Sequence, residues 1–133
     1  MTLDCTAHHT SFPVSDIARS REFYANTLGL TEIERPDIFG IAGAWFDAGP
    51  CQVHLIEVPE DADVGSPPPV CDPRARHAAF AVDDYRSTVE FLKSRGLEVF
   101  ETSEDFGQCW VADPDGHVIE LIVAPRPQNG SLQ

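Results

Sequence analysis

The chain has 133 residues, 42% of them hydrophobic, and its formal net charge is −13 at pH 7. This length fits one compact domain or two very small ones, and the composition fits a globular protein with an apolar core. The negative charge argues against nucleic acid and anionic membranes as partners, because both are negatively charged themselves. The sequence shows no apolar run as long as a membrane span and no signal-peptide pattern at its start. We therefore expect a cytoplasmic protein.

The first strand is predicted over residues 7–14, where apolar and polar side chains alternate. Phe12 and Val14 share one face of this strand, and His9 and Ser11 share the other. The apolar face is expected to pack against a helix, which leaves His9 on the opposite side of the sheet.

A helix is predicted to follow, with Ser15 or Asp16 as its N-cap and an apolar stripe running to Leu28. Gly29 is expected to end it. Three further strands are predicted at 31–35, 44–47 and 52–58, with a loop at 36–43. The predicted order of the first half is therefore βαβββ.

The second half repeats this order after a linker at 59–74 that contains three consecutive prolines. A strand is predicted at 76–82, then a helix capped by Asp83 or Asp84 and ended by Gly96. Further strands are predicted at 98–102, 108–112 and 118–123. The polar residues 125–133 are expected to form a disordered tail.

A β-hairpin is predicted where the last two strands meet, because Pro114 and the pair Asp115-Gly116 form a strong turn signal. In the strand that follows, Glu120 lies between aliphatic residues. A carboxylate in such a place is costly to bury unless it has a partner. Taken alone, it is equally well explained as an edge-strand residue that faces water.

The internal repeat places four polar residues at equivalent positions. His9 and His77 are 68 residues apart in the two first strands, and His54 and Glu120 are 66 apart in the two fourth strands. Each has apolar neighbours on the helix-facing side, so all four are expected on the opposite, concave face. Three imidazoles and one carboxylate form a ligand set for a divalent ion, one per site, and fit Fe, Ni, Zn, Co or Mn.

Four cysteines are scattered along the chain without a C-x-x-C pair, at Cys5, Cys51, Cys71 and Cys109. In a reducing compartment free thiols are expected at these positions, and the spacing does not fit a zinc knuckle.

The whole pattern from about residue 7 to 123 resembles the vicinal oxygen chelate superfamily, which includes glyoxalase I, fosfomycin-resistance thiol transferases, bleomycin-binding proteins and extradiol dioxygenases. The resemblance rests on His9, on the motif at 20–24, on Arg76-His77 and on 113–121. It implies metal ligands at His9, His54, His77 and Glu120. Glyoxalase I enzymes usually carry Glu where this chain has His54, a carboxylate that takes part in proton transfer, so the resemblance does not imply lactoylglutathione lyase activity.

The predicted fold is α+β, with two tandem βαβββ modules that form a curved mixed sheet with helices on the outer face. We expect a single glyoxalase-like domain over 1–133, with module one at 6–58, a linker at 59–74, module two at 75–124 and a tail at 125–133. The resemblance also implies a homodimer, in which each site lies within one chain or is completed by both.

The function implied is that of a metal-dependent lyase or isomerase that binds two adjacent oxygens of a small substrate to the ion. Glu120 and His54 are the expected catalytic residues, and His54 serves as a fourth ligand or as a base. The alternatives are an Fe(II) ring-cleaving dioxygenase, a fosfomycin-type thiol transferase and a bleomycin-resistance-type protein that sequesters a ligand. Four aromatic residues are candidates to line the substrate pocket, although core packing explains the tryptophans equally well: Phe39, Trp45, Phe106 and Trp110.

Overall fold

The computed structural model describes residues 1–38 and 40–125. These residues form two compact units, one up to Glu60 and one from Asp61 onward. The predicted pocket residue Phe39 and nearly all of the predicted disordered tail lie outside the described residues.

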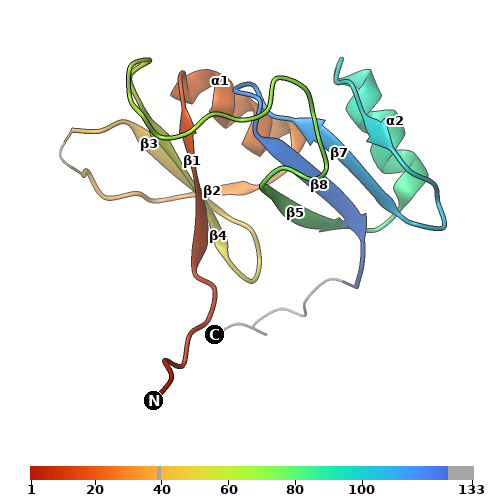
Figure 1. The fold of residues 1–133 in the computed structure, drawn as a ribbon, viewed down its shortest axis with the longest axis horizontal. Coiled ribbons are helices and arrows are strands. Elements are labelled where there is room, and N and C mark those ends of the chain that lie inside the picture. Colours follow the sequence, from red (N-terminus) through yellow and green to blue (C-terminus); the bar gives the residue numbers. More distant parts are fainter. Residues whose placement is uncertain (39, 126–133) are drawn as a thin grey trace. The chain divides into compact units, whose positions relative to one another are not determined.

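The first unit is a four-stranded mixed sheet with one helical segment (Figure 1). Its elements are β1 (His9–Val14), α1 (Ile17–Glu22), the π-helix η1 (Phe23–Thr27), β2 (Thr31–Ile33), β3 (Gly43–Asp47) and β4 (Gln52–Glu57). The strand order is β1-β4-β3-β2, with β1 parallel to β4 and the other pairs antiparallel. The predicted βαβββ order is confirmed.

The helical segment begins as predicted, because the Asp16 carboxylate accepts hydrogen bonds from the backbone N–H groups of Ala18 and Arg19. It does not continue as an α-helix to Leu28 as predicted. From Phe23 it widens into a π-helix, in which the Leu28 N–H donates to the Phe23 carbonyl at 3.0 Å. The neighbouring aromatics Phe23 and Tyr24 are both buried there, and Tyr24 packs on the apolar face of the sheet.

The second unit repeats this arrangement. Its elements are β5 (His77–Val82), α2 (Tyr85–Ser94), β6 (Phe100–Glu101), β7 (Gln108–Ala112) and β8 (Val118–Val123). The strand order β5-β8-β7-β6 and the strand directions match those of the first unit. The Asp84 carboxylate caps α2, whose buried Val89 and Leu92 face the core. The predicted α+β class with two βαβββ modules is confirmed.

Strands β2 and β6, each at one edge of its sheet, are shorter than predicted. Strand β2 ends at Ile33 instead of residue 35, and β6 covers Phe100 and Glu101 alone. Strands β2 and β6 each pair with one neighbour over only a few residues, so few backbone hydrogen bonds hold them, and Pro36 follows soon after β2.

The predicted hairpin joins β7 to β8. The Gly116 N–H donates to the Asp113 carbonyl at 2.9 Å, and Gly116 has φ +93°, the left-handed conformation that glycine adopts without strain. The buried Asp113 carboxylate accepts from the backbone N–H groups of Asp115 and His117, both at 2.9 Å. This turn fixes the register in which β8 enters the sheet.

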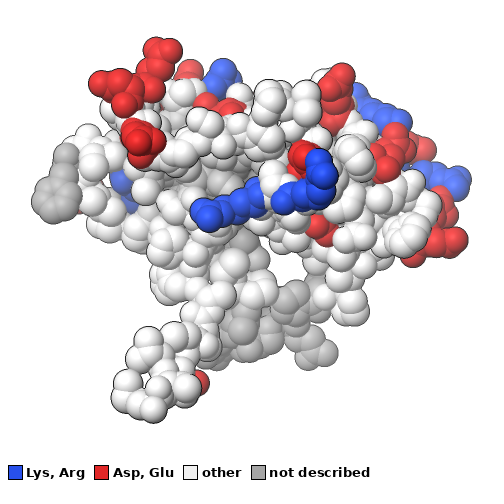
Figure 2. Space-filling view, in the orientation of Figure 1, with Lys and Arg blue, Asp and Glu red and all other residues white. Residues whose placement is uncertain are grey.

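The surface of the described residues carries many acidic groups, and the thiols are free, as predicted. Figure 2 shows carboxylates in separate groups on the visible face, several of them beside basic side chains. The four cysteines are free, and burial raises the pKa of Cys109 to about 11, so this thiol is not a ready nucleophile. Over the ranges 1–38 and 40–125, no helix has the length and apolar character needed to cross a bilayer.

Candidate metal centre

His54 and Glu120 lie on the two central strands, β4 and β8, each between two neighbouring strands. Their exposed fractions are only 6% and 7%. An edge-strand glutamate that faces water is therefore excluded as the explanation for Glu120. Both residues alternate with fully buried aliphatic side chains on the helix-facing side, such as Leu55 and Ile119, so both point to the opposite face of their own sheet.

The strand registers confirm the repeat that was counted from the sequence. Trp45 pairs with His54 across β3 and β4, and Trp110 pairs with Glu120 across β7 and β8. The first strands follow the same rule, since Ser11 pairs with His54 and its repeat equivalent, Ala79, pairs with Glu120. The two units therefore present a histidine and a glutamate at one and the same structural position.

The His54 imidazole is held between two aromatic rings. Its centroid lies 3.9 Å from that of His9 and 4.2 Å from that of Trp45, with interplanar angles of 14° and 4°. Its Nε2 lies 2.9 Å from the Gln52 amide oxygen, which accepts a hydrogen bond. Burial lowers the pKa of His54 to about 4, and the nearby imidazoles and Arg35 act in the same direction. At neutral pH the ring is uncharged, with its hydrogen on Nε2 and a lone pair on Nδ1.

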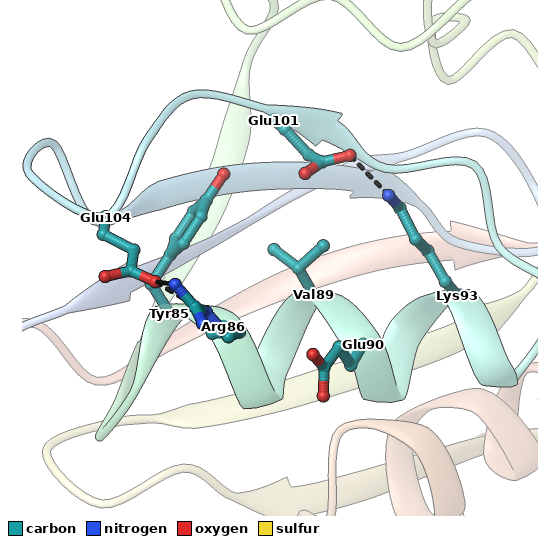
Figure 3. A pocket seen from close by; sticks show the side chains of 7 residues that line it. All are labelled: Tyr85, Arg86, Val89, Glu90, Lys93, Glu101 and Glu104. Carbon is teal, nitrogen blue, oxygen red and sulfur yellow. Dashed lines mark hydrogen bonds and ion pairs between the residues drawn. The ribbon is translucent and has the colours of Figure 1, made fainter.

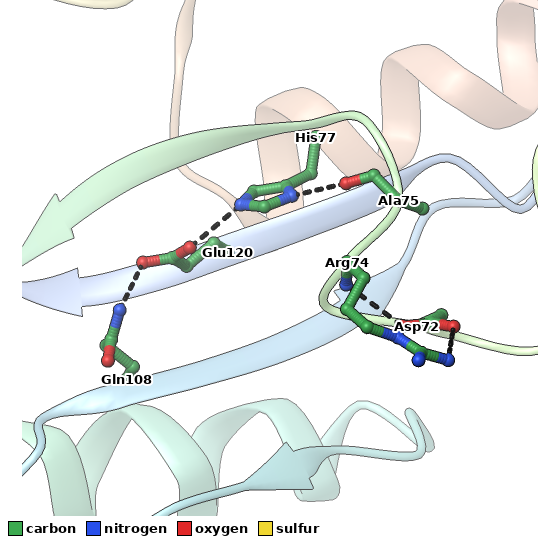
Figure 4. Close-up of polar contacts among 6 residues, drawn as sticks. All are labelled: Asp72, Arg74, Ala75, His77, Gln108 and Glu120. Carbon is green, nitrogen blue, oxygen red and sulfur yellow. Dashed lines mark hydrogen bonds and ion pairs between the residues drawn. The ribbon is translucent and has the colours of Figure 1, made fainter.

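In the second unit His77 and Glu120 are in direct contact (Figure 4). His77 Nε2 lies 2.9 Å from Glu120 Oε1, and the Gln108 amide donates to Glu120 Oε2 at 3.1 Å. His77 Nδ1 lies 2.7 Å from the Ala75 carbonyl oxygen, to which it donates. Both nitrogens of this ring therefore face oxygen atoms that accept hydrogen bonds.

This pairing fits a bound cation. A neutral imidazole has one N–H, and His77 uses it on the Ala75 carbonyl, so its Nε2 lone pair faces the lone pairs of Glu120. Two lone pairs at 2.9 Å repel unless a proton or a metal ion compensates them. Nitrogen and oxygen ligands lie about 2.0–2.2 Å from zinc, so two donors on one ion can be this close to each other.

The structure brings the four predicted ligands together as two pairs. His9 stacks on His54 in the first unit, and His77 contacts Glu120 in the second. Within the described ranges, no three His, Cys, Asp or Glu side chains form a group that fits one ion. The pairs belong to separate units, so the four-residue set stays a prediction.

The aromatic residues that were predicted to line the pocket differ in burial and in their contacts. Trp45 lies on the same face as His54 and stacks on it. Trp110 is 8% exposed and pairs with Glu120, and its buried indole N–H has no hydrogen-bond partner in the described part of the chain. Phe106 is 74% exposed, so it extends away from its unit.

Three polar residues near these pairs were missed by the sequence reasoning. Gln52 and Gln108 each hold one of the candidate catalytic side chains. Alternation along the strands would have identified them, because Gln52 is two residues before His54, and Gln108 is two before Trp110, on the same face. Arg35 had no such signal, because it lies in a loop.

A groove of about 390 Å³ lies on the other side of the second unit, along α2 (Figure 3). Two ion pairs, Arg86 with Glu104 and Lys93 with Glu101, extend across it. The groove contains none of the predicted ligands, so it is not the candidate metal centre.

Comparison with known proteins gives one family. Residues 6–121 match the Glyoxalase/Bleomycin resistance protein/Dioxygenase superfamily. The chain is 25% identical to Glyoxylase I 4 of Arabidopsis thaliana, over 86% of this chain and 68% of that protein. It is 30% identical to the glutathione transferase FosA of Serratia marcescens, over 87% of this chain and 79% of that one. A glyoxalase/dioxygenase structure from Nostoc punctiforme superposes with a TM-score of 0.73 at 26% identity, covering 91% of this chain and 92% of that one.

Proposed function

The chain belongs to the Glyoxalase/Bleomycin resistance protein/Dioxygenase superfamily, and from this premise we propose that it is a metal-dependent lyase or isomerase. Its substrate is a small molecule with two adjacent oxygen atoms. The observation that carries the proposal is the contact between His77 Nε2 and Glu120 Oε1 at 2.9 Å, which brings an imidazole nitrogen and a carboxylate oxygen close enough to bind one ion.

His9, His54, His77 and Glu120 are the proposed ligands of one divalent ion per site, from the group Fe, Ni, Zn, Co and Mn. Glu120 supplies the negative charge, and the buried, neutral ring of His54 supplies a lone pair on Nδ1. When bound, the ion supplies a Lewis acid for a substrate that offers two neighbouring oxygens. A homodimer offers two ways of completing the site, within one chain or between two chains.

Other residues of this chain orient the side chains of the proposed ligands, and His54 is a candidate for proton transfer. Gln108 and His77 fix the two oxygens of Glu120, and the rings of His9 and Trp45 fix the plane of His54. If His54 does not bind the ion, its Nδ1 lone pair would serve as the base for a substrate proton, while Gln52 would keep Nε2 in its protonated form.

Metal analysis of the purified protein tests the proposal. We expect one ion per chain after reloading with Fe, Ni, Zn, Co or Mn, and deuterium uptake from D₂O into small hydroxyketones only in the loaded protein. A chain that binds no metal but retains a small ligand would instead be a sequestering protein. Oxygen consumption with catechols in the Fe(II) form would indicate a ring-cleaving dioxygenase.

Light scattering tests the assembly. We propose a homodimer and expect twice the mass of 14.6 kDa at micromolar concentration. A monomeric mass under these conditions would contradict the dimer and would require each site to form within one chain.

A further inference from the structure

Arg35 combines three features that ordinary surface arginines lack. Its Nε is buried without a hydrogen-bond partner among the described residues. Its Nη1 donates to the Ile41 carbonyl at 2.9 Å, which holds the guanidinium in place. No carboxylate in the described ranges forms an ion pair with it, although the chain has 22 Asp and Glu residues and only 9 Lys and Arg.

The guanidinium lies against the backbone of Gly43 on β3. A Cβ atom at Gly43 would come within 2.8 Å of both Cζ and Nε of Arg35, so the missing side chain provides the space that the guanidinium fills. Gly43 is two residues before Trp45, which stacks on His54.

A guanidinium that is held in place and has no counter-ion among the described residues is suited to bind a carboxylate. Its planar fork of N–H groups matches the two oxygens of a carboxylate, and a partly buried guanidinium without a counter-ion gains most from such a partner. We propose that Arg35 binds a carboxylate group of the substrate, and that the substrate is therefore a small organic acid anion. This inference rests on the proposed function, since it names the substrate class for the face that carries His54.

Binding of butyrate tests the inference, because butyrate has a carboxylate but no second oxygen to chelate a metal. The ¹⁵N Nε–H NMR signal of Arg35, assigned from its loss in Arg35→Gln, should shift on titration with butyrate in the zinc-loaded and in the metal-free full-length protein. The neutral analogue butyramide should leave this signal unchanged. The Nε–H signal of Arg86, which is paired with Glu104, should not respond to either compound.

Variants complete the test. Arg35→Gln should weaken butyrate binding about tenfold or more, the loss expected for a charge-assisted hydrogen bond. Arg35→Lys should recover part of the affinity, because it keeps the charge and loses the fork. The exposed control Arg86→Gln should bind butyrate like the unmodified protein.

The inference is overturned if butyramide and butyrate bind equally, or if Arg35→Gln binds butyrate normally. Methylphosphonate binding about tenfold more tightly than butyrate would also overturn the assignment, in favour of a phosphonate. Because binding is also measured without metal, failure of the metal centre leaves the carboxylate result unaffected, and the two hypotheses can fail separately.

Discussion

The indole of Trp45 lies parallel to the imidazole of His54, with ring centroids 4.2 Å apart and planes inclined by 4°. His9 stacks on the other side of the same imidazole. A ring enclosed in this way, on a central strand and 6% exposed, is poorly solvated, so its charged form is disfavoured. The pKa of His54, lowered to about 4, follows from this position.

The first prediction is that the metal-free protein loses stability as the pH falls from about 6.5 to 4. In this window His54 stays neutral in the folded chain but takes up a proton in the unfolded chain, so protons favour unfolding. Above pH 6.5 the effect is absent, and below pH 4 it is complete, at about 3 kcal/mol. Urea unfolding of the chelator-treated protein at several pH values measures it.

His54→Gln is the control, because it removes the titrating ring and keeps a polar side chain. In this variant the decline between pH 6.5 and 4 should be shallower by the His54 contribution. An identical decline in both proteins would show that other groups cause it, and that the ring is better solvated than its burial indicates.

The second prediction concerns the turn before β8. Asp113→Ala should reduce the free energy of unfolding by about 1–3 kcal/mol, because the backbone N–H groups of Asp115 and His117 both lose their acceptor. Asp113→Asn keeps an acceptor oxygen and should cost less. Denaturant titrations of the two variants measure the difference, and equal stability in both would show that water replaces the carboxylate.

The third prediction concerns Gly43. Gly43→Ala should destabilise the first unit by about 1–3 kcal/mol or more, because the new Cβ would lie 2.4 Å from the Leu55 carbonyl oxygen and would also displace Arg35. The backbone of a central strand cannot move as a flexible side chain does. Thermal unfolding measures the loss, and an unchanged melting temperature would show that β3 shifts freely.

Much of the fold could be predicted from the sequence, because the βαβββ pattern occurs twice and each copy supports the interpretation of the other. The alternation around His54 and Glu120 predicted correctly which face each strand buries, and counting predicted that these two residues are equivalent. The repeat also misled in one detail. The spacing of 68 residues that relates His9 to His77 also aligns Phe23 with Phe91. However, Phe23 is buried and Phe91 is 42% exposed, whereas the following pair, Tyr24 and Leu92, is buried in both units.

The rest depended on interactions that have no periodic signal. The π-helix at Phe23–Thr27 occurs where two adjacent aromatic residues, Phe23 and Tyr24, are both buried. The spacing of apolar residues along an α-helix does not predict this widening. Arg35 is held by the Ile41 carbonyl, which lies in a loop, and by the space beside Gly43, which has no side chain. Both contacts come from residues several positions further along the chain, so no local sequence pattern predicts them. Contacts of Gln52 and Gln108 depend on rotamers that the sequence does not specify.

The last prediction is that Glu120→Ala abolishes metal binding without unfolding the protein. Glu120 is the only carboxylate among the four proposed ligands, and its loss leaves neutral imidazoles that compensate none of the charge of a divalent ion. Affinity should fall by more than about a hundredfold, beyond the effect of removing a residue that only supports a ligand. The fold should persist because Ile119 and Leu121 still fill the core, with a cost of about 1–3 kcal/mol for the partners left by Glu120.

Metal content and thermal stability should be measured together for Glu120→Ala, for His54→Ala and for the control Glu104→Ala, which removes an exposed carboxylate paired with Arg86. The control should bind metal normally. His54→Ala should match Glu120→Ala if His54 binds the ion, and should retain most of the metal if His54 acts as a base. A full complement of metal in Glu120→Ala would show that the proposed ligand set is wrong, and the contact between Glu120 and His77 would then be a buried ion pair with a proton in place of the metal.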